Sequence, residues 1–397
     1  MKQYRQLKPF THHQLLAIKA EFIRQSLTAA KGKPESLAWF DSLIKPWQKN
    51  LVTRQPVLVM DFGGSYFRSG VAEVDDNQQL IWRRALISVK IVREYTNVDT
   101  FVNWLADKTA PLIKQLTADR VGFVFSHAFD SKKSNGHITG IITYLSKALV
   151  IPGLLGKDLG RFFLKALQLR GLHLKKFVML NDTVALALCA KNAPAGLVIG
   201  TGANLCSLHP TLPHLRNLEA GHFNGVPHSF ASIYADLMEN PTRAMMEKQS
   251  TGLYQYQNLA FASLQAGLQP VISQAIMQEG KETASLIVTK LSNRDFNLLK
   301  SIKLTSAEKN QLTKLSKIIL QNSYQMWAAA VAAVIDLNQN KLKDRVISVP
   351  VTGGVILNDP NYYAGLKSTI EALTKRPVQL IKVADPIKGA AVAALME

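Results

Sequence analysis

The chain has little cysteine, no hydrophobic leader and no long apolar run, and each shortage excludes a class of protein. Its two cysteines, Cys189 and Cys206, lie in apolar stretches of a 397-residue chain and are too few for a secreted disulfide scaffold. We expect both to be small buried hydrophobes that stay reduced in the cytoplasm. The N-terminal sequence lacks a signal-peptide core, and no stretch reaches the about 18 apolar residues that a membrane span needs. We therefore expect a cytoplasmic protein without a membrane span.

Acidic residues are also scarce: 28 Asp and Glu face 47 Lys and Arg, which gives a formal net charge of +19. Such an excess favours polyanions, anionic membranes or phosphorylated substrates as partners. A nucleic-acid-binding protein is one hypothesis, but the sequence has no recognisable DNA-reading or RNA-reading module, so we expect no specific nucleic acid partner. The nine histidines form no zinc-binding pattern, and His209 and His214, which flank a proline-rich loop, are expected to be exposed.

Apolar residues are plentiful, at 47% of the chain against 19% charged residues, and this length and composition predict two lobes with sizeable cores. The pattern predicts an N-terminal helix over residues 12–30 and three consecutive strands between residues 56 and 90. Helices and strands then alternate up to a second strand–glycine-turn–strand unit at residues 196–208, which echoes residues 58–71 and indicates an internal duplication. Because strands joined by tight turns run antiparallel, both sheets are expected to be mixed, which excludes a plain parallel Rossmann sheet. We predict an α/β protein with two mixed-sheet lobes and a nucleotide site in the cleft between them.

Two glycine turns carry the first chemical signal. The segment Asp61-Phe62-Gly63-Gly64-Ser65-Tyr66-Phe67-Arg68 joins two predicted strands. Its glycines would expose backbone N–H groups to an anion, Ser65 would add a hydroxyl donor, and Arg68 would offer a charged fork to phosphate. An ordinary glycine hairpin is the alternative for one such motif. The turn Gly200-Thr201-Gly202 supplies a second cradle, which makes that alternative weaker.

These motifs resemble those of the hexokinase family, and they occur in the family's order over roughly residues 50–395. DFGGSYFR is similar to its first phosphate motif, LVIGTGANLCSL to its second, VMLNDTVALAL to its catalytic Asn-Asp-Thr motif and VTGGV to its adenosine motif. The resemblance implies a two-lobed actin-like ATPase fold of duplicated ribonuclease H-like domains, with the active site in the interlobe cleft. It also implies lobes over residues 54–182 and 183–384, an N-terminal helix and linker over residues 1–53 that pack on the large lobe, and a C-terminal helix over residues 385–397 that returns to the small lobe.

The resemblance also implies roles for individual residues. The general base falls on Asp182, for which the alternative is an N-cap of the helix that follows. The implied sugar-binding residues are Ser126, Ser146, Lys147, Asn181, Asn204, Glu219 and Glu247. The implied nucleotide-binding residues are Asp61, Gly63, Gly64, Ser65, Arg68, Gly200, Thr201, Gly202, Gly353 and Gly354, and Asp61 would also hold Mg²⁺ through water.

Several residues depart from the family pattern. Ser65-Tyr66 replaces Thr-Asn, Ser146 replaces threonine, His127-Ala128 replaces an apolar-proline pair, and Leu145 and Ala220 stand where the family commonly has tryptophan. The catalytic positions are kept, so these changes bear on sugar affinity and selectivity more than on the type of reaction. The chain is also shorter than eukaryotic single-unit members, which favours trimmed loops and a bacterial source.

The expected function is therefore that of an ATP-dependent hexokinase or glucokinase. It would transfer the γ-phosphate of MgATP to the 6-hydroxyl of a hexose such as glucose, as a monomer or homodimer. A catalytically weakened, hexokinase-like regulatory protein that still binds sugar is the alternative. The sequence does not rank glucose, fructose and mannose, because all three offer similar hydroxyls.

Overall fold

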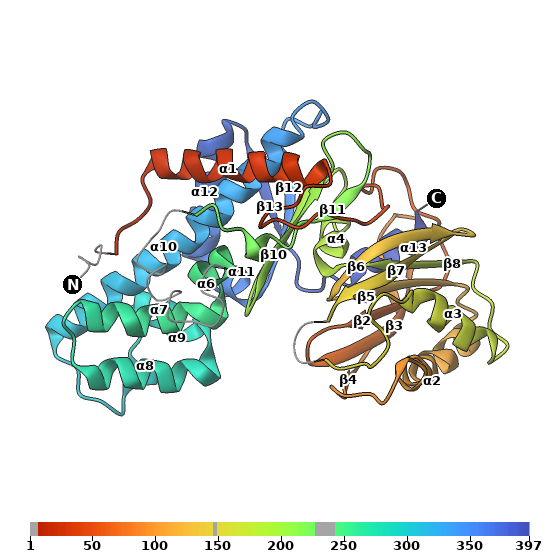
Figure 1. Ribbon diagram of the computed structural model, residues 1–397, viewed down its shortest axis with the longest axis horizontal. Helices are drawn as coiled ribbons and strands as arrows, with labels where there is room; N and C mark the ends of the chain where they lie inside the picture. The colour runs from red at the N-terminus through yellow and green to blue at the C-terminus, as the bar shows by residue number, and fades with distance from the viewer. Residues whose placement is uncertain (1–6, 146–148, 227–242, 397) are drawn as a thin grey trace. The chain divides into compact units, whose positions relative to one another are not determined.

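The computed structural model describes residues 7–145, 149–226 and 243–396. It divides into two compact units, each built from several segments of the chain (Figure 1). The strand-rich unit comprises residues 40–196, 206–217 and 385–397, and the helical unit comprises residues 1–39, 197–205 and 218–384.

A seven-stranded mixed sheet forms the centre of the strand-rich unit, with the strand order β4-β3-β2-β5-β8-β7-β6. Its strands are β2 (Val57–Phe62), β3 (Tyr66–Val74), β4 (Leu80–Lys90), β5 (Arg120–Phe125), β6 (Ala128–Ser134), β7 (His137–Tyr144) and β8 (Lys176–Leu180). Strands β2, β3 and β4 form the predicted antiparallel meander. Strand β2 is parallel to β5, which is parallel to β8, so the predicted mixed sheet is confirmed in this unit.

Helices cover both faces of this sheet. Residues of α2 (Val98–Leu116) and α3 (Leu159–Gln168) share one apolar core with Leu58, Met60 and Phe62 of β2. Residues of α4 (Asp182–Ala187) and α13 (Lys388–Leu395) share the other core with Val57 and Val59. The apolar side chains of β2 alternate between these two cores, so the strand is a continuous hydrophobic run from Val57 to Met60.

A second sheet has six strands in the order β1-β11-β10-β9-β12-β13. Its strands are β1 (Phe40–Asp41), β9 (Ala195–Ile199), β10 (Ala203–Leu208), β11 (Leu215–Asn217), β12 (Ile347–Thr352) and β13 (Val378–Lys382). In the strand-rich unit β11 pairs antiparallel with β1 and β10, and in the helical unit β12 pairs parallel with β9 and β13.

Helices make up most of the helical unit. They are α1 (His12–Ala30), α6 (Met245–Ser250), α7 (Gly252–Gln265), α8 (Pro270–Thr283), α9 (Ser285–Ser292), α10 (Ser306–Leu337), α11 (Gly354–Asn358) and α12 (Pro360–Thr374), with short 3₁₀ turns at Ala220–His222 and Asn297–Leu299. Helix α10 packs against α1 and α12 (Figure 1). Among the described helices α10 alone is long and apolar enough to span a membrane, but 83% of its apolar window is buried in the protein, as in the core helix of a globular fold.

The division of the chain differs from the predicted lobes in three places: residues 40–53, 183–196 and 206–217 belong to the strand-rich unit and not to the helical unit. The boundary between the lobes was expected after Asp182, whereas the strand-rich unit continues to residue 196. The reason is that α4, which begins at Asp182, packs against α13 of the same unit. A Cβ added to Gly389 of α13 would lie 1.7 Å from the carbonyl oxygen of Ala185, so the two helices are in backbone contact.

Candidate functional site

Three predicted segments meet at one edge of the strand-rich unit. Strands β2, β5 and β8 are parallel neighbours, and their next residues are Gly63, Ser126 and Asn181 respectively. The N–H of Ser126 donates to the carbonyl oxygen of Phe62 at 3.2 Å, which joins the first two segments directly. The carboxyl edge of parallel strands is where open α/β sheets bind ligands.

An ion-pair network lies beside the first glycine turn. Arg68 on β3 faces Asp61 on β2, and its Nε and Nη2 donate to Oδ2 of Asp61 at 3.0 and 2.6 Å. The Nη1 of Arg68 also reaches Oδ1 of Asp385 at 3.4 Å. Burial raises the pKa of Asp385, although Arg68 and Lys388 act in the opposite direction. Asp385 was not among the predicted site residues, and its only signal in the sequence is its place directly before the last helix.

The first glycine turn leaves room for a ligand. The Gly63 N–H donates to the carbonyl oxygen of Tyr66 at 3.1 Å, which closes the turn, and both Ser65 and Tyr66 are exposed. A Cβ at Gly63 would make only an ordinary contact, at 3.5 Å. The packing of the protein therefore does not demand glycine at position 63, whereas a phosphate close to the backbone would. Gly64 follows, half-buried, in the same turn.

Asn181 and Asp182 occupy the start of α4. The N-cap is Asn181, whose Oδ1 accepts from Thr183 N and Thr183 Oγ1 at 3.0 and 2.8 Å. Asp182 is the first helical residue, is half-buried, and accepts a bond from the Thr183 N–H at 2.8 Å through Oδ1. The alternative interpretation of Asp182 as the N-cap is therefore wrong, because the residue before it performs that task.

A buried thiol forms a hydrogen bond to the backbone of the same helix. Cys206 Sγ donates to the carbonyl oxygen of Thr183 and accepts from the Gly196 N–H, both at 3.1 Å. Burial, assisted by the charge of Asp182, raises the pKa of Cys206 to about 12. The residue was predicted to be a small buried hydrophobe, and the structure adds that its sulfur bridges two backbone groups.

A small pocket opens beside Asn181 within the strand-rich unit. Its polar lining includes Asp41, His127, Ser131 and Asn217. The Asp41 carboxylate is held by Arg216 at 3.1 Å. Sequence reasoning did not include these residues in the site, since they come from distant parts of the chain: Asp41 lies on β1, His127 directly before β6, Ser131 on β6 and Asn217 on β11.

In the helical unit the second glycine turn is enclosed by two other segments. The Gly200 N–H donates to the carbonyl oxygen of Gly202 at 2.8 Å, and Thr201 between them is exposed. The Gly252 N–H donates to the Gly200 carbonyl at 2.8 Å, and a Cβ at Gly252 would lie 2.7 Å from that oxygen. Gly353 has a φ of 107°, and its Cβ would lie 2.2 Å from the carbonyl oxygen that precedes the turn. The second phosphate motif, the start of α7 and the adenosine motif are thus in backbone contact.

Two predicted sugar-binding segments are joined by Asn204. Its Oδ1 accepts from the Leu205 N–H at 2.7 Å and from the Ala220 N–H at 3.0 Å. The second bond fixes the residue after Glu219, which itself has a φ of 45° and a ψ of 47°. A non-glycine residue in the left-handed region is strained, and such residues concentrate at functional sites.

Glu247 reaches the same region from α6. A Cβ at Gly202 would lie 3.1 Å from Oε1 of Glu247, and one at Gly221 would lie 3.3 Å from its Cβ. The Glu247 carboxylate therefore lies between the second glycine turn and the Glu219 segment. Its neighbour Lys248 is buried, which lowers the pKa of that amine, so the Glu247-Lys248 pair is not the solvated charged face that the sequence alone would favour.

Each unit thus assembles one group of the predicted residues. The strand-rich unit brings together the residues of the first phosphate motif, Ser126 and the Asn181-Asp182 pair. The helical unit brings together Asn204, Glu219, Glu247 and the two other glycine motifs, including Gly354, whose position has no neighbour closer than 3.8 Å to an added Cβ. Ser146 and Lys147 lie outside the described residues.

Comparisons with known proteins give a consistent result. Two hexokinase family models match residues 1–191 and 194–396. The candidate glucokinase-2 of Saccharomyces cerevisiae is 24% identical over 90% of this chain and 84% of its own length. A solved hexokinase from Schistosoma mansoni, complexed with glucose, is 16% identical with a TM-score of 0.75, over 97% of this chain and 96% of the other. A second hexokinase crystal structure has the same TM-score at 19% identity, over 97% and 94% of the two chains.

Proposed function

Because the chain belongs to the hexokinase family, we propose that it transfers the γ-phosphoryl group of MgATP to the 6-hydroxyl of a hexose, with glucose as the first substrate to test. One observation carries the proposal: a glycine turn, a serine and an Asn-Asp pair follow three adjacent parallel strands, so that Gly63, Ser126 and Asp182 share one edge of the sheet. A phosphate cradle and a carboxylate base are the parts that this reaction requires.

Asp182 is the proposed general base. A sugar hydroxyl is a poor nucleophile, so a carboxylate must accept its proton while the oxygen–phosphorus bond forms. Oδ1 of Asp182 is engaged by a backbone N–H, and no hydrogen bond engages Oδ2 in the described part of the chain. Such a base typically contributes a factor of about 10²–10⁴ in rate.

The proposed sugar contacts combine donors and acceptors. The Oδ1 of Asn181 is used within α4, so the Nδ2 amide is the end that would donate to a hydroxyl. Glu219 and Glu247 would accept hydroxyl protons, and Asn204 would contribute a further amide. Several such pairs are needed, because each buried hydroxyl left without a partner costs about 1–3 kcal/mol.

The proposed nucleotide contacts involve the glycine turns, Arg68 and Asp61. Mg²⁺ is usually bound through one or two carboxylates, water and the substrate phosphates, and the buried Asp61 carboxylate beside an open glycine turn fits such a site. Asp61 would hold the ion through water, and the ion would neutralise charge on the phosphate oxygens. The Arg68 guanidinium is held beside this turn by Asp61 and Asp385, and it would offer its remaining N–H groups to phosphate.

The first experiment measures ADP release from MgATP with glucose, fructose, mannose or no sugar. The native chain is compared with Asp182→Ala and with a matched control, Asp99→Ala, which removes an exposed aspartate from the first turn of α2. We expect hexose-dependent turnover that falls by about 10²–10⁴ in Asp182→Ala and is retained in the control. If no hexose supports turnover in the native chain while glucose still binds, the alternative of a sugar-binding regulatory protein replaces this proposal.

We propose in addition that the protein acts in the cytoplasm, as a monomer or homodimer. Two free thiols, one of them fully buried, support a reducing compartment. Size-exclusion chromatography with light scattering measures the oligomeric state.

A further inference from the structure

Helix α1 and the loop after it lie against the segments that carry Glu219 and Glu247, all within the helical unit. The Phe22 ring of α1 contacts the Phe223 ring edge-on, with the centroids 4.9 Å apart. A Cβ at Gly225 would come within 2.4 Å of the Glu21 Cγ. The chain just after Glu219 therefore lies directly on α1.

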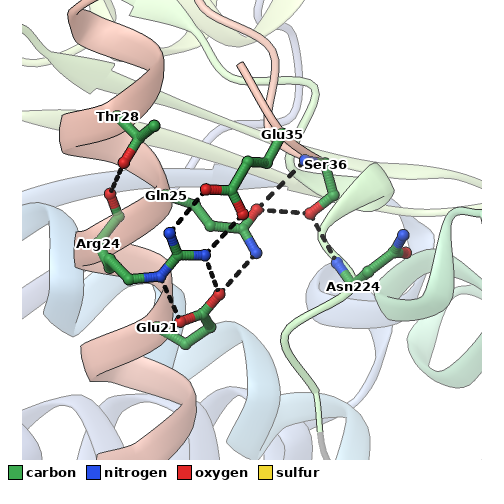
Figure 2. Close-up of polar contacts among 7 residues, drawn as sticks. All are labelled: Glu21, Arg24, Gln25, Thr28, Glu35, Ser36 and Asn224. Atoms are coloured by element: carbon green, nitrogen blue, oxygen red, sulfur yellow. Dashed lines mark hydrogen bonds and ion pairs between the residues drawn. The ribbon is translucent and has the colours of Figure 1, made fainter. Parts of the chain in front are cut away.

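Hydrogen bonds continue this contact through Ser36 (Figure 2). Ser36 Oγ donates to Gln25 Oε1 at 2.6 Å and accepts from the Asn224 N–H at 3.0 Å. Gln25 is buried on α1, and its Nε2 donates to Glu21 Oε1 at 2.8 Å. Arg24 in turn holds Glu21 with two bonds of 2.8 and 2.6 Å. One serine hydroxyl thus links the buried face of α1 to the segment after Glu219.

Asn224 extends this hydrogen-bond network to α6, the helix that contains Glu247. Its Oδ1 accepts from the Met245 N–H at 3.2 Å, and the carbonyl oxygen of Phe223 accepts from the Met246 N–H at 3.0 Å. The residue at the N-cap position, Ala244, has no polar side chain that could accept from the first N–H groups of α6, and its φ is 52°. The first N–H groups of a helix need partners from outside the helix, and here Phe223 and Asn224 supply two of them.

We propose that Asn224 and Ser36 are positioning residues that set the relation of Glu219 to Glu247. They touch neither the sugar nor the nucleotide in this proposal. Asn224 holds the segment of one glutamate against the helix of the other, and Ser36 fixes Asn224 to α1. The inference rests on the proposed function, because it concerns how well the two carboxylates meet a hexose.

The test uses the full chain with Ser36→Ala, Asn224→Ala and Asn224→Asp. Asn224→Asp keeps a side-chain oxygen for the Met245 N–H, so it serves as the conservative variant. The matched control is Ser368→Ala on α12, which removes an exposed hydroxyl that donates to the Gly365 carbonyl. Each variant is assayed for kcat, for the KM of glucose and for the KM of MgATP. Amide hydrogen exchange is followed at Met245 and Met246.

We expect Ser36→Ala and Asn224→Ala to raise the KM of glucose about 5- to 10-fold, the loss of one net hydrogen bond. Their kcat and KM of MgATP should change less than the KM of glucose, because the hydrogen bonds of Ser36 and Asn224 given above reach α1 and the start of α6 and not a glycine turn. Asn224→Asp and Ser368→Ala should resemble the native chain. The amide hydrogens of Met245 and Met246 should exchange faster with solvent in Asn224→Ala only.

A similar rise in both KM values together with a fall in kcat would show general destabilisation and overturn the inference. An unchanged KM of glucose in Asn224→Ala would also overturn it. An Asn224→Asp variant as poor as Asn224→Ala would overturn it too. Failure of the proposed function is seen in the native chain alone, as absence of hexose-dependent turnover. In that case amide exchange decides: unchanged exchange at Met245 and Met246 overturns the positioning role, and faster exchange supports it.

Discussion

The two ends of the Asn181 amide have separate tasks, and one substitution can remove one task without the other. The oxygen caps α4 through Thr183, and the Nδ2 group is the proposed sugar donor. Asn181→Ser keeps a capping oxygen, because serine is about as good an N-cap as asparagine, but it has no amide donor. Asn181→Ala removes both. The two variants therefore separate helix stability from sugar binding.

The magnitudes follow from these contacts. Loss of an N-cap oxygen costs about 1 kcal/mol, which lowers the melting temperature by roughly 2–4 °C in a unit of this size. A sugar hydroxyl left without its donor costs about 1–3 kcal/mol, which is roughly 5- to 150-fold in the KM of the hexose. We expect Asn181→Ser to show the second effect alone and Asn181→Ala to show both.

The assays are thermal unfolding by circular dichroism and initial rates over a range of glucose concentrations. Asn97 provides the matched control, because it caps α2 with the same pair of bonds, to Thr100 N at 2.8 Å and Thr100 Oγ1 at 2.9 Å. Asn97→Ala should lose similar stability with an unchanged KM, and Asn97→Ser should change neither. An unchanged KM in Asn181→Ser would refute the sugar role of the amide. Unchanged stability in Asn181→Ala would refute the capping argument.

Three further predictions concern the surroundings of this helix and the first turn. Gly389→Ala should lower the free energy of unfolding by at least about 1–3 kcal/mol in urea titrations, because the new Cβ would lie 1.7 Å from the Ala185 carbonyl oxygen; native-like stability would contradict this contact. The buried Cys206 thiol, with its pKa raised to about 12, should resist iodoacetamide at pH 8.5 until urea unfolds the protein; labelling is followed by mass spectrometry, and rapid labelling in native buffer would contradict the prediction. Its contribution to the free energy of unfolding should be lost as the pH rises from about 9 towards 12, because the thiol of the unfolded chain ionises first. Arg68→Lys should raise the KM of MgATP or lower kcat by about tenfold or more, because lysine cannot reproduce a bidentate fork, while glucose affinity measured by calorimetry stays unchanged; a loss confined to glucose affinity would place Arg68 elsewhere in the mechanism.

Elements with a strong local pattern could be predicted from the sequence. The meander of β2, β3 and β4 follows from its apolar runs and short turns, and α1 and α2 follow from their helical spacing. The hairpin of β6 and β7 was not predicted. In β6 only Phe129 is buried while Lys132 and Lys133 face solvent, so the strand lacks the alternation that sequence reasoning uses.

Local polar contacts were harder to predict than strands. His209 and His214 were expected to be exposed because a proline-rich loop lies between them. His209 is in fact buried, and its Nδ1 accepts from the N–H groups of Thr211 and Leu212 at 3.0 and 2.7 Å. His214 is half-buried, 3.5 Å from Asp41. A side chain that closes its own loop satisfies backbone donors that composition does not reveal.

Residues of the site could be assigned one at a time from motifs, but their partners could not. Arg68 was expected to serve phosphate alone, whereas it also contacts Asp385, which is 317 positions away in the chain. Cys206 contacts the backbone of α4 through a sulfur that the sequence marks only as apolar. Such pairings depend on which strands become neighbours, and a single sequence gives the strands without giving their final order.

The glycines of the motifs have two different tasks, and only the structure separates them. Gly252 and Gly353 are required by the fold itself, because an added Cβ would lie 2.7 and 2.2 Å from backbone oxygens. Gly63, Gly200 and Gly354 have no neighbour closer than 3.5 Å to such a Cβ. The first pair therefore brings the strands and turns into contact, whereas the second set leaves backbone open that only an incoming group would fill. Because both units contain open glycines beside fixed polar side chains, each contributes a surface suited to an anionic ligand.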